Sequence, residues 1–343
     1  MRKIKVGING FGRIGRAFLK VAWDRPEIEI VAVNDLGSVE NMAYLLKYDT
    51  AYGKWKHNNI KHEGEYLIID DKKIKVLAEK DPNKLPWKDL NIDVIVESTG
   101  LFVTYAGAKA HLDAGAKKVV VTAPMKDKPQ AGVEGATILL GINEEKFADC
   151  VITSNASCTT NAGSPLIAIL DETLGIEKAI LNTVHALTNS QPTVDSINKH
   201  NMREGRAGGH NIVPTSTGAA IAVTKAFPKL ENLFDGISIR VPMIAGSIVD
   251  VTFIAKRNTT VEEVNEILKK AAKDKRWEVI FAVTEEELVS SDILGSPYGS
   301  IADLKLTRVV GGNLVKVMGW YDNEMGYTYT LVEHVIKTGN TIN

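Results

Sequence analysis

Apolar and polar residues alternate in short runs along the first half of the chain, with helix-like spacing between the runs. Residues 3–9 and 28–34 are rich in β-branched residues and predict strands, and residues 16–23 between them have helical spacing. Strands joined by helices form right-handed crossovers, so this half predicts a doubly wound, mostly parallel α/β sheet. Further strands are expected at residues 92–97, 118–122, 137–141 and 151–153, and a further helix at 106–114.

The pattern changes after Cys158. An apolar run at 165–170 follows the cysteine and predicts a helix, and the strands expected beyond it are longer and separated by fewer helices. Such a pattern is typical of a mixed or antiparallel sheet, so we expect a second α+β domain. Residues 189–210 form a long polar loop, a feature that is usually functional. The strands are expected at residues 178–187, 237–241, 247–256 and 314–321, and the helices at 260–273 and 324–337.

Glycines occupy the first strand-to-helix turn, in the stretch Gly10-Phe11-Gly12-Arg13-Ile14-Gly15. They permit a tight turn and close backbone approach, and the helix that follows offers free N–H groups to a pyrophosphate. Asp35 follows the last glycine by about 20 residues, where a carboxylate binds ribose hydroxyls and repels a 2′-phosphate. The sequence therefore predicts a site for NAD rather than NADP. The residues expected there are Gly10, Gly12, Gly15, Asn34, Asp35, Thr99 and Thr122.

Cys158 is the candidate nucleophile because it directly precedes the predicted helix at 165–170. A helix N-terminus favours the thiolate, which is the reactive form of cysteine. Taken alone, a cysteine is more often a buried small hydrophobe, which is our interpretation of Cys150. His185 alone would more often be a core histidine, and Arg240 alone a member of an ion pair.

Composition excludes several classes of function. The 343 residues carry a net charge of −1, which offers no footprint for nucleic acid or for an anionic membrane. No apolar run approaches a membrane span, and the two cysteines cannot form a disulfide framework, so we expect a cytoplasmic protein. His57, His62, Glu63 and Glu65 lie in a predicted polar hairpin with no metal-site spacing, and we expect no bound metal.

The chain resembles the phosphorylating glyceraldehyde-3-phosphate dehydrogenase family over essentially its whole length. The resemblance rests on INGFGRIGR, LLKYD, ESTG, SNASCTTN, HALT, PTSTGAA, Arg240-Val241-Pro242 and WYDNE, in the family's order and spacing. It implies a Rossmann domain at residues 1–156, a catalytic domain at 157–321 and a C-terminal helix at 322–343 that packs back on the first domain. It also implies a homotetramer.

The same resemblance implies a mechanism and assigns residues to it. Cys158 would attack glyceraldehyde 3-phosphate with His185 as base, a hydride would pass to NAD, and inorganic phosphate would release 1,3-bisphosphoglycerate. Arg13 and Ile14 would line the dinucleotide site, and Asn323 would hold the nicotinamide carboxamide. The substrate phosphate is assigned to Thr188 and Arg240, and the attacking phosphate to Ser157, Thr159, Thr217 and Gly218, with Arg206 assisting.

Two departures and two alternatives accompany this hypothesis. Ser190 and the segment 243–246 differ from the family pattern near the expected substrate-phosphate site. One alternative is a sister enzyme acting on erythrose 4-phosphate, against which the phosphate-binding pattern at 215–218 argues. The other is a non-catalytic nucleotide-binding scaffold, against which the presence of both Cys158 and His185 argues.

Overall fold

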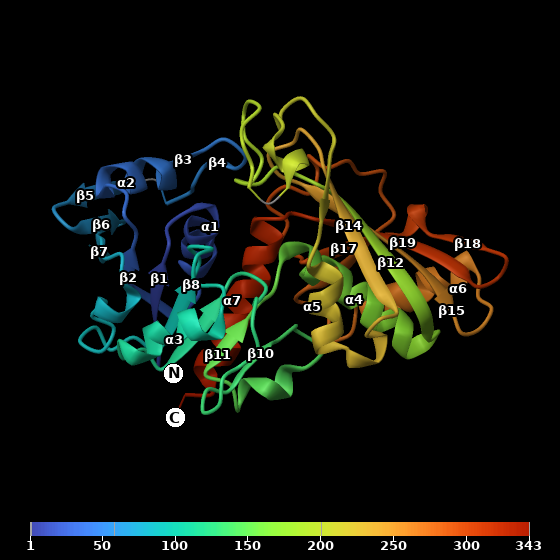
Figure 1. Ribbon diagram of the computed structural model, residues 1–343, viewed down its shortest axis with the longest axis horizontal. Coiled ribbons are helices and arrows are strands. Elements are labelled where there is room, and N and C mark those ends of the chain that lie inside the picture. Colours follow the sequence, from blue (N-terminus) through green and yellow to red (C-terminus); the bar gives the residue numbers. More distant parts are fainter. Residues whose placement is uncertain (1, 58, 200, 343) are drawn as a thin grey trace. The chain divides into compact units, whose positions relative to one another are not determined.

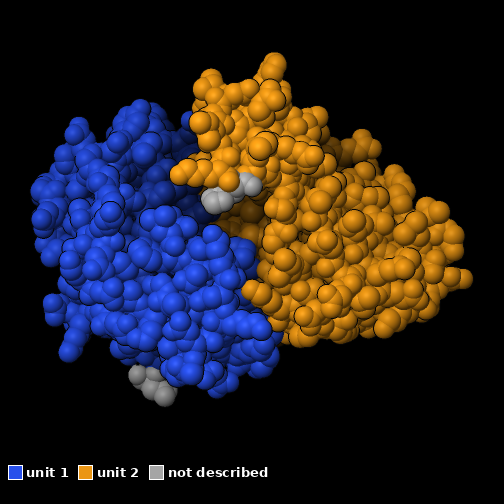
Figure 2. Space-filling model, in the orientation of Figure 1, with its two compact units in different colours: residues 1–138, 143–156, 331–343 blue, residues 139–142, 157–330 orange. Residues whose placement is uncertain are grey.

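The computed structural model describes residues 2–57, 59–199 and 201–342, and the chain divides into two compact units (Figures 1 and 2). Unit 1 contains Met1–Ile138, Asn143–Ala156 and Leu331–Asn343, and unit 2 contains Leu139–Ile142 and Ser157–Thr330. Within the three described stretches, every helix is too short or too polar to cross a membrane.

Unit 1 is built on a nine-stranded sheet in the order β10-β11-β9-β8-β1-β2-β7-β6-β5 (Figure 1). The strands are β1 (Ile4–Asn9), β2 (Ile28–Asn34), β5 (Ile60–Glu63), β6 (Tyr66–Ile69), β7 (Lys72–Leu77), β8 (Val94–Glu97), β9 (Lys118–Val121), β10 (Gly135–Thr137) and β11 (Ile152–Ser154). The run β7-β2-β1-β8-β9-β11 is parallel and has the 3-2-1-4-5-6 order of a Rossmann sheet. The predicted doubly wound fold is thereby confirmed, and its strand order reverses between β1 and β8.

The helices of unit 1 differ in whether a side chain accepts the free backbone N–H groups of the first turn. They are α1 (Arg13–Ala22), α2 (Val39–Lys47) and α3 (Tyr105–Asp113), with the short 3-10 helices η1 (Pro82–Lys84) and η2 (Glu144–Phe147). Ser38 caps α2 and Thr104 caps α3, each hydroxyl accepting a backbone N–H of the first turn. Gly12 is the N-cap residue of α1 and has no side chain that accepts these N–H groups.

The chain's last helix, α7 (Met325–Asn340), begins in unit 2 and ends in unit 1. In unit 1 its His334 ring contacts the Thr153 hydroxyl of β11 at 2.8 Å. A Cβ at Gly339 would lie 2.5 Å from the Ile4 side chain of β1, so the helix end packs closely on the sheet. A separate short pair of strands in unit 1 consists of β3 (Tyr48–Asp49) and β4 (Gly53–Lys54).

The strand predicted at 137–141 is wrong in position. The sheet strand is β10, which ends at Thr137, and Ile138, Leu139 and Leu140 follow it as irregular chain. These three side chains are at most 3% exposed. Their apolar character therefore reflects burial without strand pairing, an ambiguity that short apolar runs carry.

Unit 2 is built on an eight-stranded mixed sheet in the order β13-β14-β12-β15-β19-β17-β16, with β18 paired to β19. The strands are β12 (Ile176–His185), β13 (Val213–Ser216), β14 (Phe234–Arg240), β15 (Ser247–Ala255), β16 (Phe281–Thr284), β17 (Ser300–Asp303), β18 (Arg308–Val310) and β19 (Leu314–Tyr321). β12 is parallel to β14 and antiparallel to β15, so the predicted mixed sheet is confirmed.

Three α-helices of the described chain lie wholly in unit 2, and one of them, α4, begins at the candidate nucleophile Cys158. They are α4 (Cys158–Thr173), α5 (Ala219–Ala226) and α6 (Val261–Ala271), with the 3-10 helices η3 (Met202–Gly205), η4 (Pro228–Leu230) and η5 (Leu304–Leu306). α4 contacts β15 and β19, and its residues 159–171 are buried. Because α4 is held along most of its length, the position of Cys158 at its first turn is fixed.

Candidate active site

The turn between β1 and α1 has the backbone shape required to bind a pyrophosphate. Gly10 has φ +92°, and a Cβ there would lie 2.6 Å from the Thr99 backbone nitrogen. A Cβ at Gly15 would lie 2.1 Å from the Gly10 carbonyl oxygen, so the helix start and the turn touch. A Cβ at Gly12 meets nothing within 4 Å, which leaves open space beside the first N–H groups of α1.

Asp35 lies directly after β2, partly exposed, with its carboxylate oriented by two backbone groups. Its Oδ2 accepts the Phe11 N–H at 2.7 Å and its Oδ1 accepts the Gly37 N–H at 2.9 Å. The carboxylate is therefore held beside the glycine turn, where it retains lone pairs for ribose hydroxyls. Asn34, the last residue of β2, is buried and bonds Asn9 and Glu79 instead.

Four other residues predicted for the dinucleotide site also lie in unit 1, at strand ends or in the first turn of α1. The Thr99 hydroxyl donates to the Glu97 carboxylate and accepts the Leu101 N–H. The Arg13 guanidinium pairs with Asp49 at 3.2 Å, so Arg13 offers the site its backbone rather than its charge. Thr122 follows β9, and Ile14 lies partly buried in the first turn of α1.

In unit 2, Cys158 faces His185. Sγ of Cys158 lies 3.3 Å from Nε2 of His185, and Nδ1 of His185 lies 2.7 Å from the Ala186 carbonyl oxygen. A carbonyl only accepts, so Nδ1 carries the ring proton and Nε2 presents its lone pair to the thiol. Ser157 is the N-cap residue of α4, and its hydroxyl accepts the Thr160 N–H at 3.1 Å.

Burial and one guanidinium set the protonation states of this pair. Burial lowers the pKa of His185 to about 3, and the positive charge of Arg240 acts in the same direction. Burial also raises the pKa of the Cys158 thiol, while Arg240 and hydrogen bonds with Thr159 oppose that rise. Burial therefore disfavours the charged form of both groups, whereas Arg240 and Thr159 favour the thiolate that the sequence predicts.

Arg240 lies opposite His185 in the parallel pairing of β12 and β14. Its Nη1 donates to the Ala186 carbonyl at 3.4 Å. Its Nε is buried, and no group in the described part of the chain accepts its hydrogen. A partly exposed guanidinium with an unsatisfied N–H beside a nucleophile is suited to bind an anionic substrate group.

A second chain of hydrogen bonds connects the histidine strand to Asn323. The Ser247 hydroxyl accepts the Ala186 N–H at 3.1 Å and contacts Oδ1 of Asn323 at 3.2 Å. Oδ1 also accepts the Gly246 N–H at 3.0 Å, so the carboxamide is fixed with its nitrogen directed away from these partners. Gly246 has φ +89°, and a Cβ there would lie 2.6 Å from the Ser290 carbonyl oxygen. The glycine that departs from the family pattern is therefore required by the backbone of this turn.

Tyr321 is a site residue that the sequence analysis did not assign. Its hydroxyl contacts Thr159 at 2.9 Å and Thr183 at 2.7 Å, and its ring packs edge-on against His185 with centroids 5.9 Å apart. The available signal was the alternation of β19, which places Tyr321 on the buried face. Tyr321 therefore joins α4, β12 and β19 behind the reactive pair.

The remaining predicted phosphate ligands bond within their own segments. Thr188 contacts Ser190 and Gln191, both at about 3 Å, and the Thr217 hydroxyl accepts the Ala219 N–H at 3.2 Å. Gly218 is the N-cap residue of α5. Arg206 pairs with Asp195 at 2.8 Å on the exposed loop, so its charge is already matched there. The contacts above join Cys158, His185, Arg240 and Thr159, and they do not connect Thr188, Arg206, Thr217 or Gly218 to the thiol.

Comparison with known proteins covers almost the whole chain. The NAD-binding domain of glyceraldehyde 3-phosphate dehydrogenase matches residues 4–105, and the C-terminal domain of the same family matches residues 157–323. Glyceraldehyde-3-phosphate dehydrogenase of Streptomyces coelicolor is 45% identical over 342 residues, covering 99% of both chains. Glyceraldehyde-3-phosphate dehydrogenase 2 of Streptomyces avermitilis is 44% identical over the same length and coverage. The Eremothecium gossypii enzyme of that name is 44% identical over 336 residues, covering 97% of this chain and 99% of its own.

Proposed function

The chain belongs to the glyceraldehyde-3-phosphate dehydrogenase family, and we propose that Cys158 and His185 carry the reaction of that family here. It is an NAD-dependent enzyme that oxidises glyceraldehyde 3-phosphate in glycolysis. The observation that carries the residue assignment is the 3.3 Å approach of Sγ to an Nε2 whose proton is held on Nδ1 by Ala186.

The first step is addition of the thiol to the aldehyde. The Cys158 proton moves to Nε2 of His185 as Sγ bonds the carbonyl carbon, and His185 then passes that proton to the carbonyl oxygen to give a thiohemiacetal. A neutral imidazole is the form that accepts this proton, and burial supplies it, with the pKa of His185 near 3. Arg240, whose buried Nε–H has no acceptor in the described part of the chain, binds the substrate phosphate.

The second step converts the thiohemiacetal to a thioester. His185 removes the hydroxyl proton while the carbon loses a hydride, for which bound NAD is the acceptor. Inorganic phosphate then attacks the thioester and forms the acyl phosphate, and the departing Cys158 sulfur takes back the proton held by His185. We assign this phosphate to Ser157, Thr159, Thr217 and Gly218. We assign the nicotinamide carboxamide to Asn323 and the substrate phosphate to Thr188 beside Arg240, with Arg206 assisting at both phosphates.

The residues of unit 1 fit the cofactor. Gly12 leaves open space at the first turn of α1, where a Cβ would meet nothing within 4 Å, and the Asp35 carboxylate is oriented beside it. Both features suit a dinucleotide with free ribose hydroxyls. We propose residues 1–156 and the helix 322–343 as the NAD domain, and residues 157–321 as the substrate domain.

The test is NADH formation from glyceraldehyde 3-phosphate and NAD, with and without inorganic phosphate, beside Cys158→Ser. The proposal predicts a phosphate-dependent rate that falls at least about a thousandfold in the variant, since the nucleophile and its transferable proton are changed. Erythrose 4-phosphate and NADP serve as competing substrates. A rate that ignores phosphate, or that survives in Cys158→Ser, contradicts the assignment.

We further propose a homotetramer in the cytoplasm. On the sheet of unit 2, Ile180 of β12, Ile237 of β14 and Leu314 of β19 are 57%, 50% and 41% exposed, which supports association of this sheet with another copy. Cys150 and Cys158 are both free thiols, which suits a reducing compartment. Light scattering after size-exclusion chromatography measures the assembly directly, and a monomeric mass contradicts it.

A further inference from the structure

Three adjacent parallel strands of unit 1 end on polar residues whose side chains bond to one another. β1 ends on Asn9, β2 on Asn34 and β8 on Glu97, and the pairing places Asn9 opposite both of the others. Nδ2 of Asn9 donates to Glu97 at 2.6 Å, and Nδ2 of Asn34 donates to Oδ1 of Asn9 at 2.7 Å. All three are at most 5% exposed. The row therefore links the strand ends beneath the dinucleotide turns.

Glu97 lies at one end of this row, next to Asn9, and its carboxylate is satisfied by donors alone. Oε1 accepts the N–H and the hydroxyl of Thr99 at 2.8 and 2.5 Å, and Oε2 accepts from Asn9 and from Nε2 of His111. Thr99 in turn accepts the Leu101 N–H at 3.0 Å, which fixes the turn after β8. A buried carboxylate is stable only with such compensation, so the position of each donor is tightly defined.

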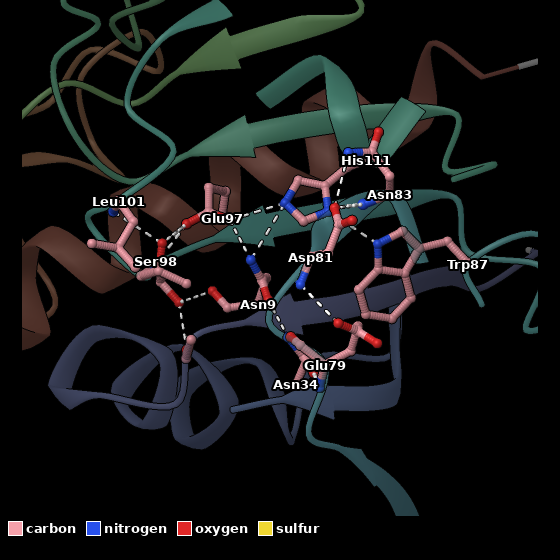
Figure 3. Close-up of polar contacts among 12 residues, drawn as sticks. Asn9, Asn34, Glu79, Asp81, Asn83, Trp87, Glu97, Ser98, Leu101 and His111 are labelled. Atoms are coloured by element: carbon pink, nitrogen blue, oxygen red, sulfur yellow. Dashed lines mark hydrogen bonds and ion pairs between the residues drawn. The ribbon is translucent and has the colours of Figure 1, made fainter. Parts of the chain in front are cut away.

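His111 of α3 completes the row from behind (Figure 3). Its ring lies between Glu97 and Trp87, and the Trp87 indole N–H donates to Nδ1 at 3.0 Å. An indole nitrogen only donates, so Nδ1 is the acceptor and the ring proton lies on Nε2, directed at Glu97. Trp87 thus selects the tautomer that lets His111 hold the carboxylate at 2.9 Å.

The residues of the row lie directly before the three turns predicted to hold NAD. Gly10 follows Asn9, Asp35 follows Asn34, and Thr99 lies two residues after Glu97. Gly10 packs so closely on the Thr99 backbone that a Cβ would lie 2.6 Å from its nitrogen. A small shift of Glu97 or Asn9 therefore displaces the groups that meet the cofactor, although neither side chain of the row needs to touch it.

We propose that Glu97 and His111 are positioning residues for NAD. Through their contacts with Asn9 and Thr99, and through the bond of Asn9 to Asn34, they fix the positions of the turns that follow β1, β2 and β8. The proposal rests on the cofactor function of unit 1, and it does not depend on the chemistry assigned to Cys158. It predicts that breaking the row weakens NAD binding selectively, while turnover at saturating NAD and the affinity for glyceraldehyde 3-phosphate are retained.

The test measures NAD dissociation constants by titration calorimetry, together with KM and kcat, for His111→Leu, Glu97→Gln and His111→Gln. His111→Leu removes the ring N–H that donates to Glu97. Glu97→Gln replaces one carboxylate oxygen with an NH2 group, which then faces the N–H groups that the oxygen accepted. Each is expected to raise the NAD dissociation constant about tenfold, with kcat within about twofold. His111→Gln keeps an N–H toward Glu97 and is expected to stay within about threefold of the wild type.

Leu67→Ala is the matched control, because Leu67 is fully buried in β6 of the same unit and lies outside the row. It is expected to lower the melting temperature without changing NAD affinity. Where His111→Leu does not fold, Trp87→Phe decides, since it removes the group that fixes the His111 tautomer. Unchanged NAD affinity in the folded variants, or an equal loss in Leu67→Ala, overturns the proposal. Direct NAD titration gives this answer even if the phosphate-dependent reaction fails.

Discussion

His111 in unit 1 and His185 in unit 2 are both buried, yet the groups around them give the two rings opposite properties. At His111 the Trp87 indole donates to Nδ1, so Nε2 carries the proton and donates to Glu97. At His185 the Ala186 carbonyl accepts from Nδ1, so Nε2 has a free lone pair facing Sγ of Cys158. The partner at Nδ1 therefore decides whether the other nitrogen holds a neighbour or accepts a proton.

The two surroundings differ in their remaining hydrogen-bond capacity as well. Around His111, Glu97 and Asn9 bond to groups of the same unit, so the network fixes positions. Around His185, the Arg240 Nε–H is buried without an acceptor in the described chain, and the thiol is partly exposed. A satisfied cluster stabilises one geometry, whereas an incomplete one is available for a ligand.

The largest expected effect is on the base itself. His185→Asn removes the Nε2 lone pair, so kcat should fall by about 10²- to 10⁴-fold, the range for a lost general base. NAD affinity should stay unchanged. Steady-state kinetics measure the first value and calorimetry the second. A His185→Asn enzyme that retains more than about a tenth of the wild-type kcat contradicts the distinction between the two histidines.

The next effect concerns the unsatisfied guanidinium. Arg240→Ala should raise the KM for glyceraldehyde 3-phosphate about tenfold to a hundredfold, because a charge-assisted contact to phosphate is lost. Arg240→Lys keeps the charge but loses the planar fork, so it should lie between the two. Initial rates over a range of substrate give KM and kcat separately. An unchanged KM in Arg240→Ala shows that the phosphate binds elsewhere.

A third buried histidine, His334, predicts how the stability of the protein depends on pH. His334 has its proton on Nδ1 facing Asn155, as His185 does facing Ala186, but its Nε2 is occupied by Thr153 at 2.8 Å. Burial lowers its pKa from the ordinary value of 6.5 to about 3. The unfolded state therefore binds a proton below pH ~6.5 that the folded state binds only near pH ~3, and stability falls as the pH falls through that window.

Urea unfolding at several pH values measures this dependence. The His334 contribution to the slope is at most about 1.4 kcal/mol per pH unit. His334→Gln, which can still donate to Asn155, should remove that part of the slope between pH ~6 and ~5. Equal slopes for both proteins contradict the buried neutral state of His334.

The smallest effect is expected at the support behind the reactive pair. Tyr321→Phe removes the hydroxyl that contacts Thr159 and Thr183, and should lower the unfolding free energy by about 1–2 kcal/mol. The ring against His185 is retained, so kcat should fall only a few-fold. Denaturant unfolding and initial rates provide both numbers. A loss of kcat as large as that in His185→Asn assigns Tyr321 to the chemistry instead.

Features that depend on neighbouring residues were predictable from the sequence. The glycine turn, Asp35 at its strand end and Cys158 at its helix start follow from local spacing, and the structure has each there. Alternation along the chain likewise indicated both sheets. The apolar run at 138–140 was misassigned to a strand because burial and pairing have the same local signature.

Features that depend on distant packing were not predictable. The contacts of His111 with Trp87 and with Glu97 join a loop, a helix and a strand end, and no local pattern specifies them. Burial raises the pKa of the Cys158 thiol, and the spacing of residues around the cysteine carries no signal of that burial. Arg206 was expected to assist at a phosphate, and only the folded loop places it against Asp195.

The most direct test of the central claim is a single-turnover experiment without inorganic phosphate, followed by mass spectrometry of the Cys158 peptide. Because the thioester then has no acceptor, the account predicts a burst of one NADH per active site and a 3-phosphoglyceroyl adduct on Cys158. It predicts no adduct in Cys158→Ser or Cys158→Ala. Continuous turnover without phosphate, or an adduct on Cys150 instead, would contradict the assignment of Cys158 and His185 as the reactive pair.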